Sequence, residues 1–133
     1  MISASLMCLA LNVYHESRSD VISGQYAVAL TTINRVQSNN FPASVCSVVH
    51  QGYHKGRHRC QFSWYCDGKS DKPYEELQWA MALLVASDVI QGNVPDFTKG
   101  SDHYHATYVK PYWAKQMQYV GQYGSHLFYK ENR

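Results

Sequence analysis

The strongest helix signal lies in residues 3–18, which read SASLMCLALNVYHESR. Leu6, Leu9 and Val13 fall on one stripe at three- and four-residue spacing, and Glu16 continues it, as in an amphipathic α-helix. A carboxylate at the edge of a core is desolvated, which raises its pKa toward the range that a general acid requires. Glu16 is therefore the leading candidate for a catalytic acid. The alternative is that it faces solvent or pairs with Arg18 or Arg35.

Two further helices are predicted downstream. The second begins near Ser23, a suitable N-cap, and runs to about Gln37. It is apolar nearly all round, so we expect it to be central and buried. The third opens at Pro73, a favoured first-turn residue that acidic residues follow, and it ends at Gly92.

The rest of the chain is less regular. Residues 38–72 show no periodic pattern, and irregular stretches of that length in a compact domain are often functional. After a turn at residues 93–96, aromatic-rich segments at 103–108 and 119–129 predict short strands, with a hairpin turn at residues 123–125. We therefore predict a single α+β domain over residues 1–133, with a helical core and short strands in the C-terminal third.

The charge balance argues against nucleic-acid binding. The formal net charge is +2 with 17% charged residues, whereas a nucleic-acid-binding domain carries a clustered basic stripe. The nearest approach to one, residues 54–59 (HKGRHR), is interpreted as a solvated loop. A weakly basic surface still favours approach to an anionic polymer such as a cell wall. The eleven tyrosines suit stacking on sugars as well as core packing.

Four cysteines leave the disulfide pattern open. Cys8 lies in the apolar helix and is predicted to be a buried thiol. One disulfide among Cys46, Cys60 and Cys66 is expected if the protein works outside the cytosol. A zinc site built from these three cysteines lacks the support of a CxxC or HExxH spacing, so neither a metal nor another cofactor is predicted.

Two segments offer ligands for a sugar. Residues 61–68 (QFSWYCDG) alternate polar and aromatic side chains, a composition typical of a sugar subsite. Within it, Asp67 is either a second carboxylate or part of an Asp-Gly turn. In residues 103–109 (HYHATYV), an extended chain places His103 and His105 on one face and Tyr104 on the other. For this pair of histidines we favour a cleft edge over a metal site.

Taken together, these stretches resemble the cell-wall hydrolase family that includes the spore-cortex-lytic enzymes. The matching pieces are, in order, residues 9–18, 24–29, 33–36, 41–46, 61–64 with 67–68, 104–106 with Val109, Pro111, Trp113 and Ala114, then Gly121 and 126–129. The resemblance implies a lysozyme-like α+β fold acting on peptidoglycan, and it places Glu16 on the family's catalytic glutamate. The chain departs from the family at Ser19-Asp20, where a Gly-Glu or similar pair is usual, and in a His- and Arg-rich insert at residues 51–59.

The resemblance further implies cleavage of the β-1,4 bond between N-acetylmuramic acid and N-acetylglucosamine. A lytic transglycosylase needs Glu16 alone, as acid and then base, whereas a muramidase needs a second carboxylate, for which Asp67 and Asp20 are the candidates. We favour the transglycosylase. The alternatives are the muramidase, a zinc-dependent amidase and a non-catalytic wall-binding module. The residues expected to contact substrate are Gln25, Gln61, Ser63, Trp64, Tyr104, His105 and Tyr108.

Peptidoglycan glycan strands are the expected partner, bound by a monomer without stable membrane insertion. Residues 2–13 are too short for a membrane span, and no Lys or Arg precedes them as in a signal peptide. This layout favours a phage endolysin that reaches the wall through a holin, a virion or another export route.

Overall fold

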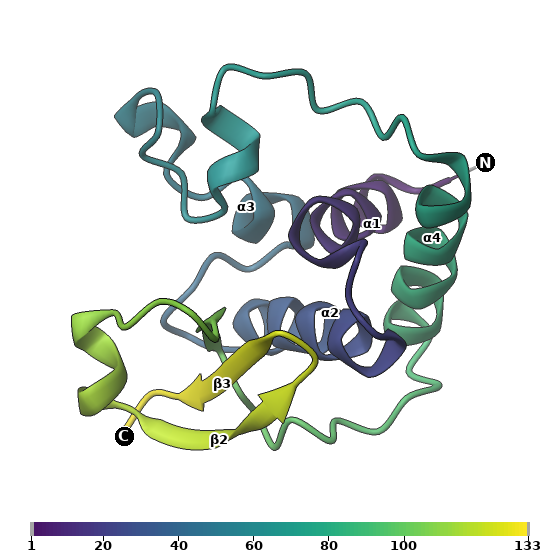
Figure 1. The fold of residues 1–133 in the computed structure, drawn as a ribbon. Helices are drawn as coiled ribbons and strands as arrows, with labels where there is room; N and C mark the ends of the chain where they lie inside the picture. The colour runs from purple at the N-terminus through teal and green to yellow at the C-terminus, as the bar shows by residue number, and fades with distance from the viewer. Residues whose placement is uncertain (1, 133) are drawn as a thin grey trace.

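The computed structural model describes residues 2–132 and shows three long helices packed together, with a small sheet against one of them (Figure 1). Helix α1 spans Ala4–Ser17, and Ser3 caps it because its Oγ accepts a hydrogen bond from the Leu6 N–H at 3.1 Å. Leu9 and Val13 on its apolar stripe are fully buried. The first helix is thus confirmed, and it packs against α2, α3 and α4.

Helix α2 (Ile22–Val36) is the buried central helix that its composition predicts. Ala27, Val28 and Ala29 are fully buried. The predicted N-cap was wrong: Ser23 lies inside the helix and Val21 holds the N-cap position. The Asp20 carboxylate accepts a hydrogen bond from the Val21 N–H at 2.9 Å, so an acidic side chain one residue earlier holds the start of this helix.

Helix α4 (Glu76–Ile90) begins three residues later than Pro73, where we predicted it. The chain before it is held extended, because the Glu75 N–H donates to the Tyr14 hydroxyl at 3.0 Å and the Glu75 carboxylate pairs with Arg18 at 2.9 Å. The predicted end is confirmed, with Gly92 at a φ of +75° directly after the last turn.

The stretch at residues 38–72 is more ordered than its sequence suggests. It contains helix α3 (Val45–Val49) and two 3-10 turns, η1 (Tyr53–Lys55) and η2 (Ser63–Cys66). Ser44 caps α3, with its Oγ accepting from the Ser47 N–H at 3.2 Å, and Val45, Val48 and Val49 face the core. The Ser44 cap and the spacing of the valines are typical of a helix. A helix of five residues is too short to show a periodic pattern over the longer windows in which helices are recognised.

Two disulfides cross-link this part of the molecule. Cys60 pairs with Cys66, which confirms one bridge among Cys46, Cys60 and Cys66. The prediction for Cys8 was wrong: it is buried, but it is bonded to Cys46 and ties α1 to α3. Pairing across 38 residues follows from helix packing, which no local spacing reveals.

The C-terminal third forms an antiparallel sheet in the order β1-β3-β2, from β1 (His103–Ala106), β2 (Gln118–Tyr123) and β3 (His126–Lys130). A 3-10 turn, η3 (Tyr112–Gln116), lies between β1 and β2 in the chain. Gly124, at a φ of +60°, makes the predicted hairpin turn. The sheet packs on α2 through Phe128, which is fully buried with Ala27 and Val28. The α+β class is confirmed. None of the helices in the described part of the chain combines the length and apolar character that a membrane span requires.

Candidate active site

Glu16 lies in the last turn of α1 and meets the sheet there. Its Oε1 accepts a hydrogen bond of 2.5 Å from the hydroxyl of Tyr104, which β1 supplies from 88 residues along the chain. Tyr104 is itself held by ring contacts to His126 and Phe128, with centroids 5.0 and 5.3 Å apart. The carboxyl therefore has a fixed partner on a rigid element, which is the geometry that a catalytic acid needs.

Burial sets the protonation of this pair. It raises the pKa of Glu16 above its usual value, while the Tyr104 hydrogen bond and the positive charge of Arg35 act in the lowering direction. Burial, together with the neighbouring carboxylate, holds the pKa of Tyr104 well above its usual value, so the phenol remains a hydrogen-bond donor. Glu16 can thus carry a proton at a higher pH than an exposed glutamate, as a general acid must.

A buried arginine lies behind this pair. Arg35 is 3% exposed, its Nε donates to the Asp102 carbonyl at 2.7 Å, and its guanidinium lies 4.8 Å from the Phe41 ring centroid and 5.2 Å from that of Phe62. Burial lowers the pKa of Arg35, and the charges of Tyr104, Asp102 and Glu16 oppose that shift. Its position between two rings and a carbonyl fixes a positive charge near Glu16.

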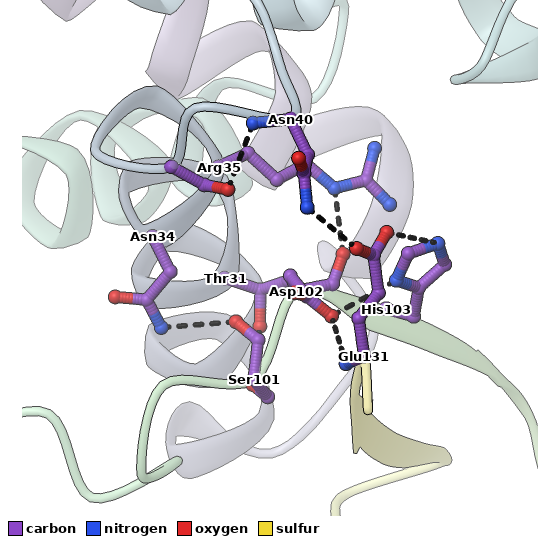
Figure 2. A network of polar contacts seen from close by, with 9 residues as sticks. Thr31, Asn34, Arg35, Asn40, Ser101, Asp102, His103 and Glu131 are labelled. Atoms are coloured by element: carbon purple, nitrogen blue, oxygen red, sulfur yellow. Dashed lines mark hydrogen bonds and ion pairs between the residues drawn. The ribbon is translucent and has the colours of Figure 1, made fainter. Parts of the chain in front are cut away.

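Figure 2 shows the polar network that anchors Arg35. Asp102 Oδ1 accepts from His103 Nδ1 at 3.0 Å and from the Glu131 N–H at 3.1 Å, so α2, β1 and the end of β3 are joined at one point. Asp102, His103 and Glu131 are also the one group of potential metal ligands found among residues 2–132, with ligand atoms within 4.8 Å of one another. In this structure Asp102 and His103 are hydrogen-bonded to each other, and the cluster supports Arg35 through the Asp102 carbonyl.

A hollow of about 310 Å³ opens beside Glu16. It is lined by His15, Glu16, Ser17, Arg18, Ser19, Asp20 and Ser125. A second groove of about 410 Å³ shares His15 and Arg18 with it and extends to Trp64, Asp67, Lys69 and Glu75. The two hollows together make a cleft past the end of α1, and Glu16 lies in its wall.

Asp20, one candidate for a second carboxylate, lies in the same hollow but is already engaged. Its oxygens accept hydrogen bonds from the Ser125 N–H and Oγ at 3.1 Å and from the Val21 N–H at 2.9 Å. It packs so closely on Gly124 that a Cβ there would lie 2.2 Å from Asp20 Oδ1. The acid therefore fastens the β2–β3 turn to the start of α2.

Asp67, the other candidate, lies in the neighbouring groove. Its Oδ1 accepts from the Lys69 N–H at 2.9 Å, and Gly68 follows at a φ of +80°. This is the Asp-Gly turn that the sequence offered as the alternative to a catalytic role.

The predicted substrate contacts divide into two groups. Trp64 lies at the cleft, yet its Nε1 donates to Asn12 at 2.9 Å and its ring stacks on His15 at 4.5 Å, so one ring face is covered. Gln61 and Ser63 are exposed on either side of the buried Phe62. Tyr104 reaches the site, with its hydroxyl on Glu16 rather than open to a sugar.

The remaining predicted contacts have other partners or face solvent. Gln25 donates from Nε2 to the Asp20 carbonyl at 3.2 Å. His105 occupies the face of β1 opposite Tyr104, where its Nε2 lies 2.9 Å from the Tyr129 hydroxyl. Tyr108 is 87% exposed beyond the end of β1.

Sequence reasoning missed two supporting residues, Asn12 and Asp102, and it considered Arg35 only as a possible ion-pair partner of Glu16. Asn12, fully buried one turn before Glu16, links Trp64 to Thr32 on α2. A buried amide on an apolar stripe is a recognisable signal, because such a group needs partners. Arg35 and Asp102 interact through the folded core, so no spacing along the chain joins them.

Known proteins of similar sequence and structure identify the family of this chain. A model of the Cell Wall Hydrolase family matches residues 19–129. The chain belongs to the cell wall hydrolase family. Two solved structures are similar over nearly the whole chain. One is the catalytic domain of the germination-specific lytic transglycosylase SleB from Bacillus anthracis, at 27% identity and a TM-score of 0.77 over 98% of this chain and 97% of that one.

The other is the catalytic domain of the Bacillus cereus SleB protein, at 27% identity and a TM-score of 0.71, covering 95% of this chain and 89% of that one. No curated protein sequence matches the chain. The family assignment from resemblance is thus confirmed. Glu16 lies three residues before the range that the family model matches, so its role depends on the geometry described above.

Proposed function

We propose that this cell wall hydrolase is a lytic transglycosylase that cleaves the β-1,4 bond between N-acetylmuramic acid and N-acetylglucosamine. The observation that carries the proposal is the Glu16–Tyr104 pair: a partly buried carboxyl with a raised pKa, held at 2.5 Å from its donor in the wall of the cleft. The similarity to the catalytic domain of SleB from Bacillus anthracis, a germination-specific lytic transglycosylase, supports the same chemistry.

In the first step, protonated Glu16 donates its proton to the glycosidic oxygen. The bond from that oxygen to C1 of the muramyl residue breaks through an oxocarbenium-like state, and the N-acetylglucosamine side leaves as an alcohol. Glu16 becomes a carboxylate as the proton departs. The Tyr104 hydroxyl, which donates to Glu16 Oε1, stabilises that charge as it forms.

In the second step, the Glu16 carboxylate takes the proton from the muramyl C6 hydroxyl. The O6 atom then bonds to C1 and closes a 1,6-anhydro ring, which regenerates the protonated acid without consuming water. One carboxyl that changes its protonation state is sufficient. This fits a cleft in which Asp20 and Asp67 are both committed to turns.

A muramidase is the second candidate, because Asp20 shares the hollow with Glu16. Digestion of purified peptidoglycan followed by mass spectrometry of the new glycan ends separates the two reactions. Muramyl ends that lack one water support the transglycosylase, whereas reducing muramic acid ends refute it and make Asp20 the next residue to test.

We further propose that the enzyme acts on the wall as a monomer. Analytical ultracentrifugation under the buffer conditions of the activity assay tests this, and a dimer there would contradict it.

A further inference from the structure

The positive charge of the chain is concentrated in one segment. Residues 50–72 hold five of the twelve Lys and Arg and two of the ten Asp and Glu. This segment therefore carries a formal charge of +3, and the rest of the chain carries −1. The segment includes the insert at residues 51–59, to which the mechanism above assigns no role.

The insert is a built structure and not a loose loop. The Gln61 N–H donates to the Gln51 carbonyl at 2.8 Å across its base, and the His58 N–H donates to the carbonyl of Cys66, whose disulfide to Cys60 follows the insert directly, at 2.9 Å. Gly52 permits the close approach: a Cβ on it would lie 2.6 Å from the Arg59 carbonyl oxygen. The backbone of the insert is therefore hydrogen-bonded at its base beside a disulfide.

These cations border a hollow of about 590 Å³, which we call the basic cradle. It is lined by Tyr53, His54, Gly56, Arg57, Tyr65, Cys66, Gly68 and Lys69. Arg57 and Lys69 are exposed, and neither has a carboxylate within 4 Å among residues 2–132. Arg57 instead donates to the Asp67 carbonyl at 3.4 Å, which aims its guanidinium across Gly68. The lining of the cradle contains no acidic side chain.

The cradle continues the cleft. Lys69 lines both the cradle and the groove that contains Trp64, and that groove shares His15 and Arg18 with the hollow at Glu16. A polymer whose bond lies at Glu16 and which follows this path reaches Arg57 and Lys69. One strand can therefore occupy both the cleft at Glu16 and the cradle.

We infer that the basic cradle binds the carboxylates of the stem peptides that hang from muramic acid residues of that strand. The inference rests on the proposed function for the identity of the strand. In peptidoglycan with intact stems, the sugars are uncharged and the peptide carboxylates carry the negative charge. Two exposed cations beside aromatic rings suit such groups, and the contact makes the enzyme prefer strands with free stem carboxylates.

The test measures binding in a Glu16→Gln background, so that it does not depend on cleavage. Soluble, uncross-linked peptidoglycan strands freed of phosphate polymers are compared with the same strands after carbodiimide-driven amidation of their carboxyl groups. The parent should bind the untreated strands roughly 2- to 30-fold more tightly, the range for two exposed ion pairs. The preference should shrink between 50 mM and 1 M salt, because screening weakens exposed charge pairs.

Arg57→Gln with Lys69→Gln should abolish the preference, whereas the charge-matched control Lys110→Gln with Lys115→Gln, on the far face of the sheet, should keep it. If the double variant misfolds, Lys69→Gln alone serves as the test, because it removes no hydrogen bond that the structure shows. It should reduce the preference for untreated strands by at least half. Equal binding of both strands by the parent, or a preference that survives loss of both cations, overturns the inference. Tighter binding of a poly(glycerol phosphate) than of the untreated strands also overturns it, in favour of a phosphate ligand.

Discussion

Removing the Tyr104 hydroxyl should slow the reaction while the aromatic ring stays in place. Tyr104→Phe deletes the donor at 2.5 Å from Glu16 Oε1 and leaves the ring contacts to His126 and Phe128 in place. A hydrogen bond to a charged group contributes about 1.5–3 kcal/mol net. Because this bond strengthens as Glu16 loses its proton in the transition state, kcat should fall roughly 10- to 150-fold with little change in KM.

The pH profile distinguishes this role from a structural one. The Tyr104 hydrogen bond acts to lower the pKa of Glu16, so its loss should raise that pKa further. The alkaline limb of the kcat profile, where the general acid deprotonates, should therefore move to higher pH. The assay is the initial rate of soluble muropeptide release across pH, with the melting temperature recorded alongside.

Tyr123→Phe is the matched control. Its hydroxyl donates to the Phe97 carbonyl at 3.0 Å, and its ring also contacts Phe128, but no contact joins it to Glu16. Tyr123→Phe should lower the melting temperature about as much as Tyr104→Phe does. It should leave kcat and the alkaline limb of the kcat profile unchanged. A Tyr104→Phe protein with kcat within twofold of wild type and an unmoved limb would refute the role given to Tyr104.

Three further changes test the supporting structure. Asp20→Asn should destabilise the fold by about 1–3 kcal/mol in chemical denaturation through weakened bonds to Ser125, with a smaller effect on kcat; a large loss of kcat at unchanged stability would instead mark a second catalytic carboxylate. Loss of the Cys8–Cys46 bridge in a Cys8→Ala, Cys46→Ala variant should cost about 4 kcal/mol for its 38-residue loop, read from denaturant midpoints of the variant and wild type without reductant, and equal midpoints would contradict this. Glu16→Gln should be more stable than wild type at neutral and alkaline pH. The raised pKa means that Glu16 stabilises the fold below its unfolded pKa and loses that contribution as pH rises through its folded pKa, so the gap in melting temperature should close on acidification.

Much of the helical frame could be predicted from local pattern. Leu9 and Val13 are buried, as their spacing on one stripe of the helix predicts. Glu16 continues that stripe, which brings its carboxyl to the edge of the core. Helix starts were less reliable, since tertiary contacts decide them. At α4, Tyr14 and Arg18 hold Glu75 in an extended conformation that Pro73 by itself does not signal.

The environment of Glu16 was harder to predict because its parts come from distant segments. Tyr104 was expected to bind sugar, yet its position on the inner face of β1 turns the hydroxyl to Glu16. Arg35 reaches the same centre from α2 through a carbonyl of Asp102. Each residue is ordinary in its local sequence, and its role follows only from how α2 and the sheet pack together.

The central claim is that Glu16 transfers the proton, and the rate of 1,6-anhydromuramyl end formation tests it most directly. Wild type, Glu16→Gln and the control Glu76→Gln are compared on the same peptidoglycan, each checked for a cooperative melt. Glu76 is an exposed acid in the first turn of α4, so its loss removes one negative charge without changing the cleft lining described above. This claim predicts a fall of about 10²-fold or more for Glu16→Gln and near-normal rates for Glu76→Gln. A folded Glu16→Gln protein that forms anhydro ends at close to the wild-type rate would contradict it.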